Sequence, residues 1–269
     1  MLMQAKAESE KTVTDPSIPR SENPHIFAIG SKAAIVGSLL GLVGNLIHPA
    51  TPLGDPQGVA RVIAANDAWF AIHFGIVIGI TLMFGGLIAL YHSIRGGLPG
   101  ALARFGLFAA GVGIAVGLIL TILDGVAAKQ LADEWASATA ETRFIALQNV
   151  LTNETMNFAL ASLFNFIFAG VTFILFGLAV ALSDVYPRWL GWVVVAAGVV
   201  SIGASLVQGV PGEPTTLSWI LTIIGPTVIT LWLLVIGVLM GRNASRTNSR
   251  KEVTGLQGDE LEHHSHRQG

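Results

Sequence analysis

The chain has 269 residues, of which 52% are hydrophobic and only 12% are charged, and its mean hydropathy is +0.65. A soluble domain normally carries about twice that share of charged residues, so the composition predicts an integral membrane protein. The chain contains no cysteine, which excludes disulfides, thiolate metal ligands and iron–sulfur clusters. Its net charge of −2 gives no reason to expect nucleic acid as a partner.

Six continuous apolar segments lie between two polar ends, and each is close to the ~20 residues that cross a bilayer. Because these runs do not alternate between polar and apolar residues, a closed β-barrel is excluded. The fold class is therefore all-α, a polytopic bundle of six transmembrane helices. The predicted spans cover residues 29–48, 69–92, 103–127, 156–182, 189–209 and 217–241.

The two polar ends differ from the membrane domain in composition. Residues 1–28 contain three prolines and mixed charges without an apolar stretch, which is typical of a disordered tail rather than a signal peptide. Residues 242–269 are also polar and are expected to be disordered. The six-helix domain then occupies residues 29–241.

The distribution of Lys and Arg predicts the orientation. If the N-terminus is inside, 12 of the 15 basic residues lie on the inner side, and only Arg61, Lys129 and Arg143 lie on the outer side. The positive-inside rule therefore gives cytoplasmic N- and C-termini. On the outer side, we expect Asp67 to cap the second span, and Trp69 and Trp219 to lie in the aromatic belt.

The connection between the third and fourth spans is long enough to form structure outside the membrane. Residues 124–135 can continue the third helix, and residues 140–152 have apolar positions at helical spacing. We expect an outer helical hairpin over residues 128–155, which offers a surface for a membrane-protein partner.

Polar residues recur at helical spacing on the spans and concentrate in the predicted outer half. His48 ends the first span before Pro49, His73 lies roughly 6 Å inside the second, and Asp124 lies near the outer end of the third. Because ionisable groups facing lipid are costly, we expect these side chains to face one another around an outward-facing polar cavity. The candidate ligand-binding residues are His73, Asp124, His48, Asn45, Asn157 and Gln208.

Two imidazoles and a carboxylate also suggest specific chemistry. Asp124 and His73 can form a pair that suits proton relay or support of a metal ligand. His48, His73 and Asp124 are candidate ligands for zinc or copper, and the two histidines alone for a haem iron. No sequence motif of a zinc protease, serine hydrolase or P-loop protein is present.

The segment Tyr186-Pro-Arg-Trp-Leu-Gly-Trp192, followed by a Gly/Ala/Val-rich helix, resembles the inner turn of uncharacterised bacterial and archaeal multi-span membrane proteins. This resemblance implies a prokaryotic plasma membrane and no particular activity.

Three functions follow from the sequence. The first is binding, extending to transport, of a small ligand or ion in the outer cavity. The second is a non-catalytic accessory or sensing subunit, and the third is a metal- or haem-dependent membrane enzyme that uses His48 and His73. Binding is favoured over an enzyme, because two histidines and one aspartate are few ligands for a dedicated metal site. The inner halves are poorly polar, which argues against transport.

Overall fold

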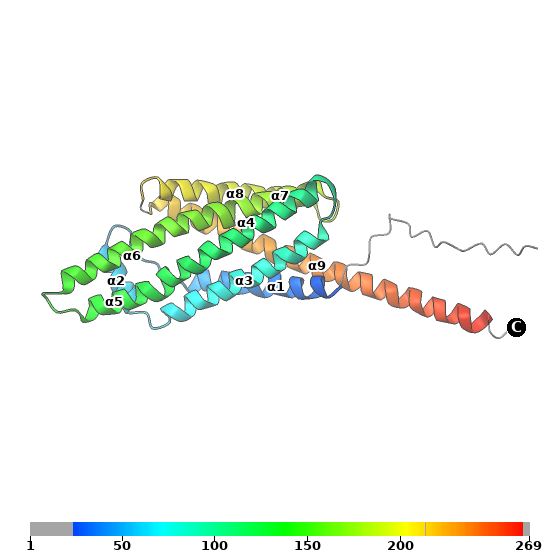
Figure 1. The fold of residues 1–269 in the computed structure, drawn as a ribbon, viewed down its shortest axis with the longest axis horizontal. Coiled ribbons are helices and arrows are strands. Elements are labelled where there is room, and N and C mark those ends of the chain that lie inside the picture. Colours follow the sequence, from blue (N-terminus) through cyan, green and yellow to red (C-terminus); the bar gives the residue numbers. More distant parts are fainter. Residues whose placement is uncertain (1–23, 213, 266–269) are drawn as a thin grey trace, which may run out of the picture.

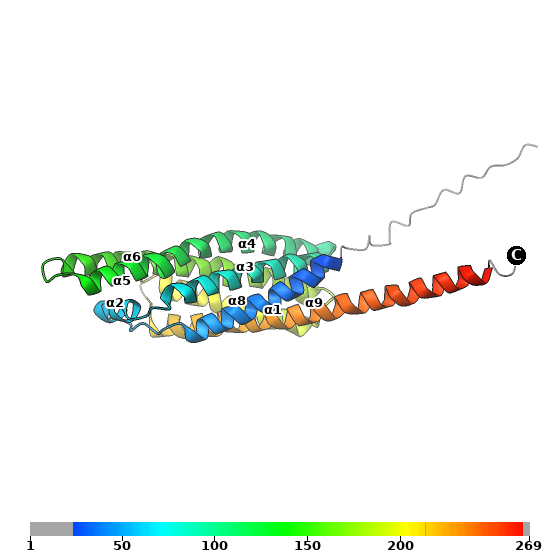
Figure 2. The same cartoon turned by 90° about the horizontal axis from the view of Figure 1, so that it is seen from below.

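The computed structural model describes residues 24–212 and 214–265, which are almost entirely helical. The chain folds into a bundle whose long helices run side by side (Figures 1 and 2). Two elements, η1 and η2, are π-helical. In chain order the elements are α1 Pro24–Ile47, α2 Pro56–Ala64, α3 Trp69–Ser93, α4 Gly97–Thr121, η1 Ile122–Ala127, α5 Ala128–Ser137, α6 Arg143–Phe164, η2 Asn165–Thr172, α7 Phe173–Leu182, α8 Arg188–Gly209 and α9 Thr216–Ser265.

Six helical stretches in the described chain are long and apolar enough to cross a membrane. They confirm the predicted all-α fold with six membrane-spanning helices. Each predicted span lies within one of these stretches to within about one residue. They cover His25–Ile47, Trp69–Ser93, Gly97–Ser137, Arg143–Leu182, Arg188–Gly209 and Thr216–Asn243.

Two of these stretches are much longer than a bilayer requires. Gly97–Ser137 has 41 residues and Arg143–Leu182 has 40, whereas about 20 residues cross the hydrocarbon core. Their extra length lies at one end of the bundle, where α5 and the start of α6 extend beyond the other helices (Figure 1). The predicted helical hairpin is therefore present. We call this the hairpin end of the bundle.

The short helix α2 closes the hairpin end. Asp55 caps it by accepting a 2.9 Å hydrogen bond from the Gly58 main-chain N–H. Its buried Ile63 packs with Trp69 and with two alanines of α5, and its Ala60 packs with Trp135 and Val150. Four elements, α2, α3, α5 and α6, thus share two small apolar clusters at the hairpin end.

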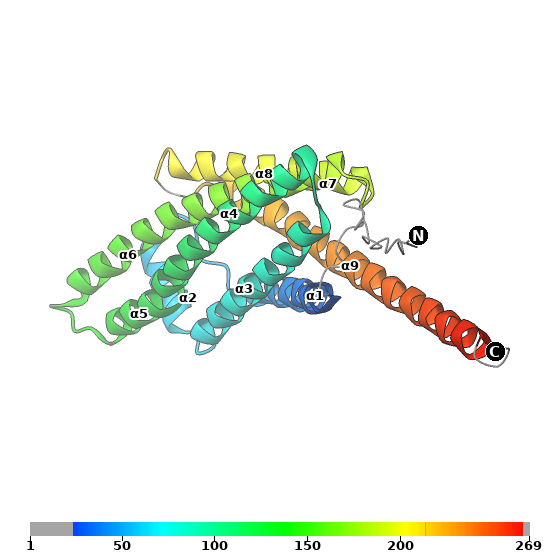
Figure 3. The same cartoon turned by 45° about the vertical axis from the view of Figure 1, so that its right-hand side comes forward.

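The main core lies toward the opposite end, where α1 begins and α9 leaves the bundle (Figure 3); we call this the tail end. It is built from aliphatic and aromatic side chains of α3, α4, α7, α8 and α9, among them fully buried Leu87, Phe173, Phe176 and Leu233. Glycines bring the helices together. A Cβ added to Gly37 of α1 would lie 2.6 Å from the main-chain oxygen of Gly79 in α3, so only glycine permits this approach.

The two ends of the chain depart from the sequence expectation in different ways. The predicted tail 1–28 lies outside the described residues up to residue 23, and α1 already begins at Pro24. At the other terminus, α9 continues as a helix to Ser265, although a disordered tail is expected from residue 242. The extension projects away from the bundle (Figure 1).

Candidate functional site

His48, His73 and Asp124, which we call the triad, meet at the hairpin end of the membrane domain. His73 Nε2 lies 3.2 Å from His48 Nε2 and 3.2 Å from Asp124 Oδ2. One ligand atom from each of the three residues lies within 4.8 Å of the others. The predicted proximity of His73 and Asp124 is thus confirmed, and His48 joins them.

Three separate segments position these side chains. Helix α1 ends at Ile47, because Pro49 disfavours the helical conformation at the residue before it and cannot donate a helical hydrogen bond. His48 is therefore the first residue of the loop. His73 lies one turn into α3, and Asp124 lies in the π-helical segment η1. Single π-helical turns inside longer helices frequently occur at functional sites.

Main-chain carbonyls orient both imidazole rings. His48 Nδ1 donates to the Pro49 carbonyl at 3.0 Å, and His73 Nδ1 donates to the Trp69 carbonyl at 2.8 Å. Because a carbonyl only accepts hydrogen bonds, each Nδ1 must carry its hydrogen. In the neutral rings both Nε2 atoms then carry lone pairs, and they face each other and a carboxylate. Such a group of lone pairs is favourable only with a cation between them, either a proton or a metal ion.

The indole ring of Trp69 packs against both histidines of the triad. Its ring centroid lies 5.1 Å from that of His48 and 4.8 Å from that of His73. Its indole N–H donates a 2.7 Å hydrogen bond to the main-chain carbonyl of Asp124. The predicted place of Trp69 in an exposed aromatic belt is wrong, since its side chain is only 1% exposed. Trp219 is 50% exposed.

The start of α3 also differs from the prediction. Asp67 does not cap this helix; instead, the Asn66 side-chain oxygen accepts a 2.9 Å hydrogen bond from the Ala68 main-chain N–H. Helix α3 begins at Trp69, so its first side chain is the one that packs on both histidines. The turn at 66–68 thus fixes the register that brings Trp69 and His73 to the triad.

Gly125 allows η1 to approach α3. A Cβ added to Gly125 would lie 2.7 Å from His73 Cβ and 3.1 Å from His73 Cγ. A larger residue at position 125 would push the imidazole of His73 away from the carboxylate of Asp124, which directly precedes Gly125 in the chain. Glycine is therefore required for the contact between His73 and the carboxylate.

Burial affects the chemistry of His48, which lies just outside the membrane-spanning part of α1. Desolvation lowers the pKa of His48 below its usual value of 6.5, although the Asp124 carboxylate opposes this shift. The imidazole of His48 is therefore neutral near pH 7, which is the form that coordinates a metal ion.

The other predicted site residues, Asn45, Asn157 and Gln208, have different surroundings. Asn45 is exposed on α1. Gln208 of α8 is buried and donates a 3.0 Å hydrogen bond to the Phe158 carbonyl of α6, while Ser205 donates to Ser162 of the same helix. The Oδ1 atom of buried Asn157 has no hydrogen-bond partner among the described residues. Polar groups between α6 and α8 thus mainly hold these two helices together.

Two polar residues near Asp124 were not among the predicted site residues, although Asn153 belongs to the polar stripe of the fourth span. Asn153 of α6 donates a 3.2 Å hydrogen bond to the Leu123 carbonyl, and Glu154 interacts electrostatically with Asp124. The available signal was the spacing of Asn153 and Asn157, which are four residues apart on one face of the helix, with Glu154 beside them.

The fold and this geometry can be compared with known proteins. Residues 32–237 match a family described as a domain of unknown function, DUF4386. The chain belongs to the DUF4386 family. No curated protein and no solved structure matches the chain. The DUF4386 match begins in α1 and ends in α9, so the triad lies inside the family domain.

Proposed function

We propose that this DUF4386 protein binds a divalent transition-metal ion through His48 Nε2, His73 Nε2 and an oxygen of Asp124. The observation that carries the proposal is the convergence of these three donor atoms within 4.8 Å, from three separate segments of the chain. Imidazole and carboxylate donors suit zinc, copper and related ions.

The two separations from His73 Nε2 fit zinc, whereas the three donor atoms as a set lie within 4.8 Å of one another, so the His48–Asp124 pair draws together when an ion binds. Ligands at 2.0–2.1 Å from a tetrahedral zinc ion are about 3.3 Å apart. His73 Nε2 is 3.2 Å from both its neighbours. Metal ligands normally donate their second ring nitrogen to a carbonyl or carboxylate, as His48 and His73 do here. Three protein ligands leave a fourth position for water or for a ligand molecule.

The same geometry does not favour haem between the two histidines. Axial ligands bind iron from opposite faces, so the flat macrocycle must lie between their nitrogens. His48 Nε2 and His73 Nε2 are only 3.2 Å apart, and Trp69 packs against both rings. These contacts leave no space for a macrocycle.

Binding is a better description than transport. The core below the triad is apolar and contains large side chains such as Phe168, Phe173 and Trp232. These rings contact one another edge to face and occupy the bundle interior. The positive-inside orientation favours the outer side of the plasma membrane for the hairpin end, so we infer an outward-facing metal site.

Titration of zinc into the chelator-treated, detergent-purified chain tests this proposal. We expect one zinc ion per chain in calorimetry and a higher unfolding temperature with zinc, because binding stabilises the folded state. In His73→Ala, zinc affinity should fall at least about tenfold, which corresponds to ~1.4 kcal/mol. His25→Ala, on the same helix that leads to His48 but at the tail end, is the matched control and should bind normally.

An unchanged zinc affinity in His73→Ala would contradict the proposal. If that variant does not fold, His48→Ala replaces it, because His48 lies in the loop and is only partly buried. Absence of stoichiometric zinc, copper, cobalt or nickel binding to the unmodified chain would also overturn the proposal.

A further inference from the structure

A second candidate site lies at the tail end, remote from the triad. A cavity of about 460 Å³ opens at the turn between α3 and α4. Its polar lining comes from Tyr91 and His92 at the end of α3, Arg95 in the turn, and Arg104 in α4. The proposed metal site does not use any of these residues.

The cavity lining is basic in the part of the chain that the structure describes. Arg95 and Arg104 both line it, and none of the described lining residues carries a carboxylate. The N-terminus of the 25-residue helix α4 starts here, at Gly97, and its dipole adds positive potential. Arg95 Nε donates to the His92 carbonyl at 3.3 Å, which holds the guanidinium beside the turn. An anion is therefore the expected ligand.

The glycine-rich turn between α3 and α4 leaves its main chain open to the close approach of a ligand. Gly96 and Gly97 have φ values of 75° and 55°, which side-chain-bearing residues rarely adopt. Both line the cavity without contributing a side chain, so an anion can approach the main chain. A Cβ added to Gly100, another lining residue, would lie 3.3 Å from the main-chain carbon of Arg95.

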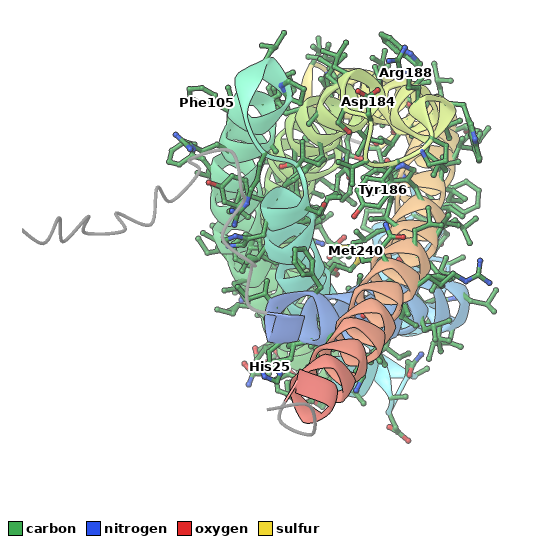
Figure 4. All side chains as sticks on the ribbon, turned by 90° about the vertical axis from the view of Figure 1, so that its right-hand side faces the viewer. His25, Phe105, Asp184, Tyr186, Arg188 and Met240 are labelled. Atoms are coloured by element: carbon green, nitrogen blue, oxygen red, sulfur yellow. The ribbon has the colours of Figure 1, made fainter. Side chains whose placement is uncertain are left out.

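An apolar surface adjoins the cavity on α4. Leu98, Phe105 and Phe108 are 63%, 65% and 73% exposed. Their spacing of seven and three residues puts them on one side of the helix. Arg104, which precedes Phe105, points about 100° away from it around the helix axis. Figure 4 shows Phe105 at the outer edge of the bundle. A ligand in the cavity can therefore continue along a lipid-facing surface.

We propose that this cavity binds the phosphate of an anionic phospholipid. Arg95 and Arg104 hold the phosphate, and the acyl chains lie along Phe105 and Phe108. Basic pockets between membrane helices on the cytoplasmic side are suited to such headgroups. The positive-inside orientation puts the tail end on that side. The apolar surface beside the cavity favours a lipid over a free phosphate ion.

Lipid-dependent unfolding of the full chain in detergent tests this inference. We expect phosphatidylglycerol to raise the unfolding temperature by about 4 °C, with a smaller effect from zwitterionic phosphatidylcholine. Inorganic phosphate at the same concentration should have no effect. In Arg95→Gln/Arg104→Gln, the phosphatidylglycerol effect should be lost, and native mass spectrometry should no longer detect the bound lipid.

Arg188→Gln is the matched control, because Arg188 also lies at the tail end (Figure 4) but is not a lining residue. It should retain the lipid effect. If the double variant does not fold, Arg104→Gln alone is used, since this side chain is exposed; its apparent lipid affinity should fall at least about fivefold. An equal response to inorganic phosphate, an unchanged response in these variants, or no preference for the anionic lipid would overturn the inference.

Discussion

The indole N–H of Trp69 donates a 2.7 Å hydrogen bond to the main-chain carbonyl of Asp124, 55 residues further along the chain. This bond joins α3 to η1 at the level of the triad. It also fixes the ring that packs on His48 and His73. The position of Asp124 is thus set by its main chain as well as by its carboxylate.

Trp69→Phe tests the importance of this bond. Phenylalanine retains an aromatic ring beside the histidines but leaves the Asp124 carbonyl without its donor. We expect a loss of about 1 kcal/mol in the free energy of unfolding and an about fivefold weaker zinc affinity. Trp219→Phe, an exchange at an exposed residue, is the control and should change neither. Zinc titration together with thermal unfolding measures both quantities. Equal behaviour of the two variants would contradict the positioning role of Trp69.

Gly125→Ala tests the close approach of η1 to α3. The added Cβ would lie 2.7 Å from His73 Cβ, so either the imidazole or the helix must move. We expect destabilisation of about 1–3 kcal/mol and at least about tenfold weaker zinc binding. Gly111→Ala, on α4, is the control, because an added Cβ there meets nothing within 4 Å. This control should be neutral or slightly stabilising. Normal zinc binding by Gly125→Ala would show that the contact does not position His73.

The membrane spans, the triad and Trp69 differ in how far the sequence predicts them. The spans were predictable, because hydrophobic length has a direct physical cause in the bilayer. The contact between His73 and Asp124 was predictable, because an ionisable side chain that faces lipid is unfavourable in free energy and two such side chains are better placed facing each other. The role of Trp69 was not, because an indole at the start of a span normally indicates the interface. Its contact with Asp124 depends on the register of α3 against η1, which no local pattern specifies.

The start of α3 and the π-helix show the same limit. Asn66 and Asp67 are both good capping residues, yet neither caps α3; the Asn66 side chain instead accepts from the Ala68 N–H in the turn before the helix. The π-helical turn around Asp124 has no local signature in the sequence. Asn45 shares a helical face with His48 by spacing alone, yet it is exposed. Helix α1 ends at Ile47, so His48 lies beyond the helix and its side chain does not follow the helical spacing from which a shared face with Asn45 was predicted.

Zinc affinity should depend on pH, because protons and the metal ion compete for the same nitrogens. The usual pKa of histidine is 6.5, and burial lowers the pKa of His48 below that value. Loss of affinity from His48 protonation therefore begins below pH 6.5. Each proton displaced on binding should weaken zinc affinity by up to about tenfold per pH unit once the pH is below the pKa of its group. Calorimetry at pH 7.5 and pH 5.5 measures this change. An affinity that stays constant even when the pH is lowered far below 6.5 would contradict histidine ligation.

Lys129 connects the hairpin end to the loop that carries His48. Its Nζ donates to the Ala64 carbonyl at the end of α2 at 2.9 Å and lies 2.7 Å from Asp133 Oδ1. A cation at a helix C-terminus stabilises the helix through its dipole. Lys129→Met keeps the aliphatic stem but removes the charge, so we expect the α2 segment to open more readily. Arg188→Met, which breaks an exposed pair with the same spacing, is the control.

Hydrogen exchange of residues 56–64 provides the measurement for Lys129→Met. Loss of one partly buried charged hydrogen bond should increase exchange by about fivefold, equivalent to ~1 kcal/mol. Because the 49–68 segment connects His48 to α3, zinc affinity should also fall, by about twofold to fivefold. Unchanged exchange in the α2 segment would mean that apolar packing of Ile63 and Ala60 alone holds this helix. In that case the position of His48 would not depend on the cation of Lys129.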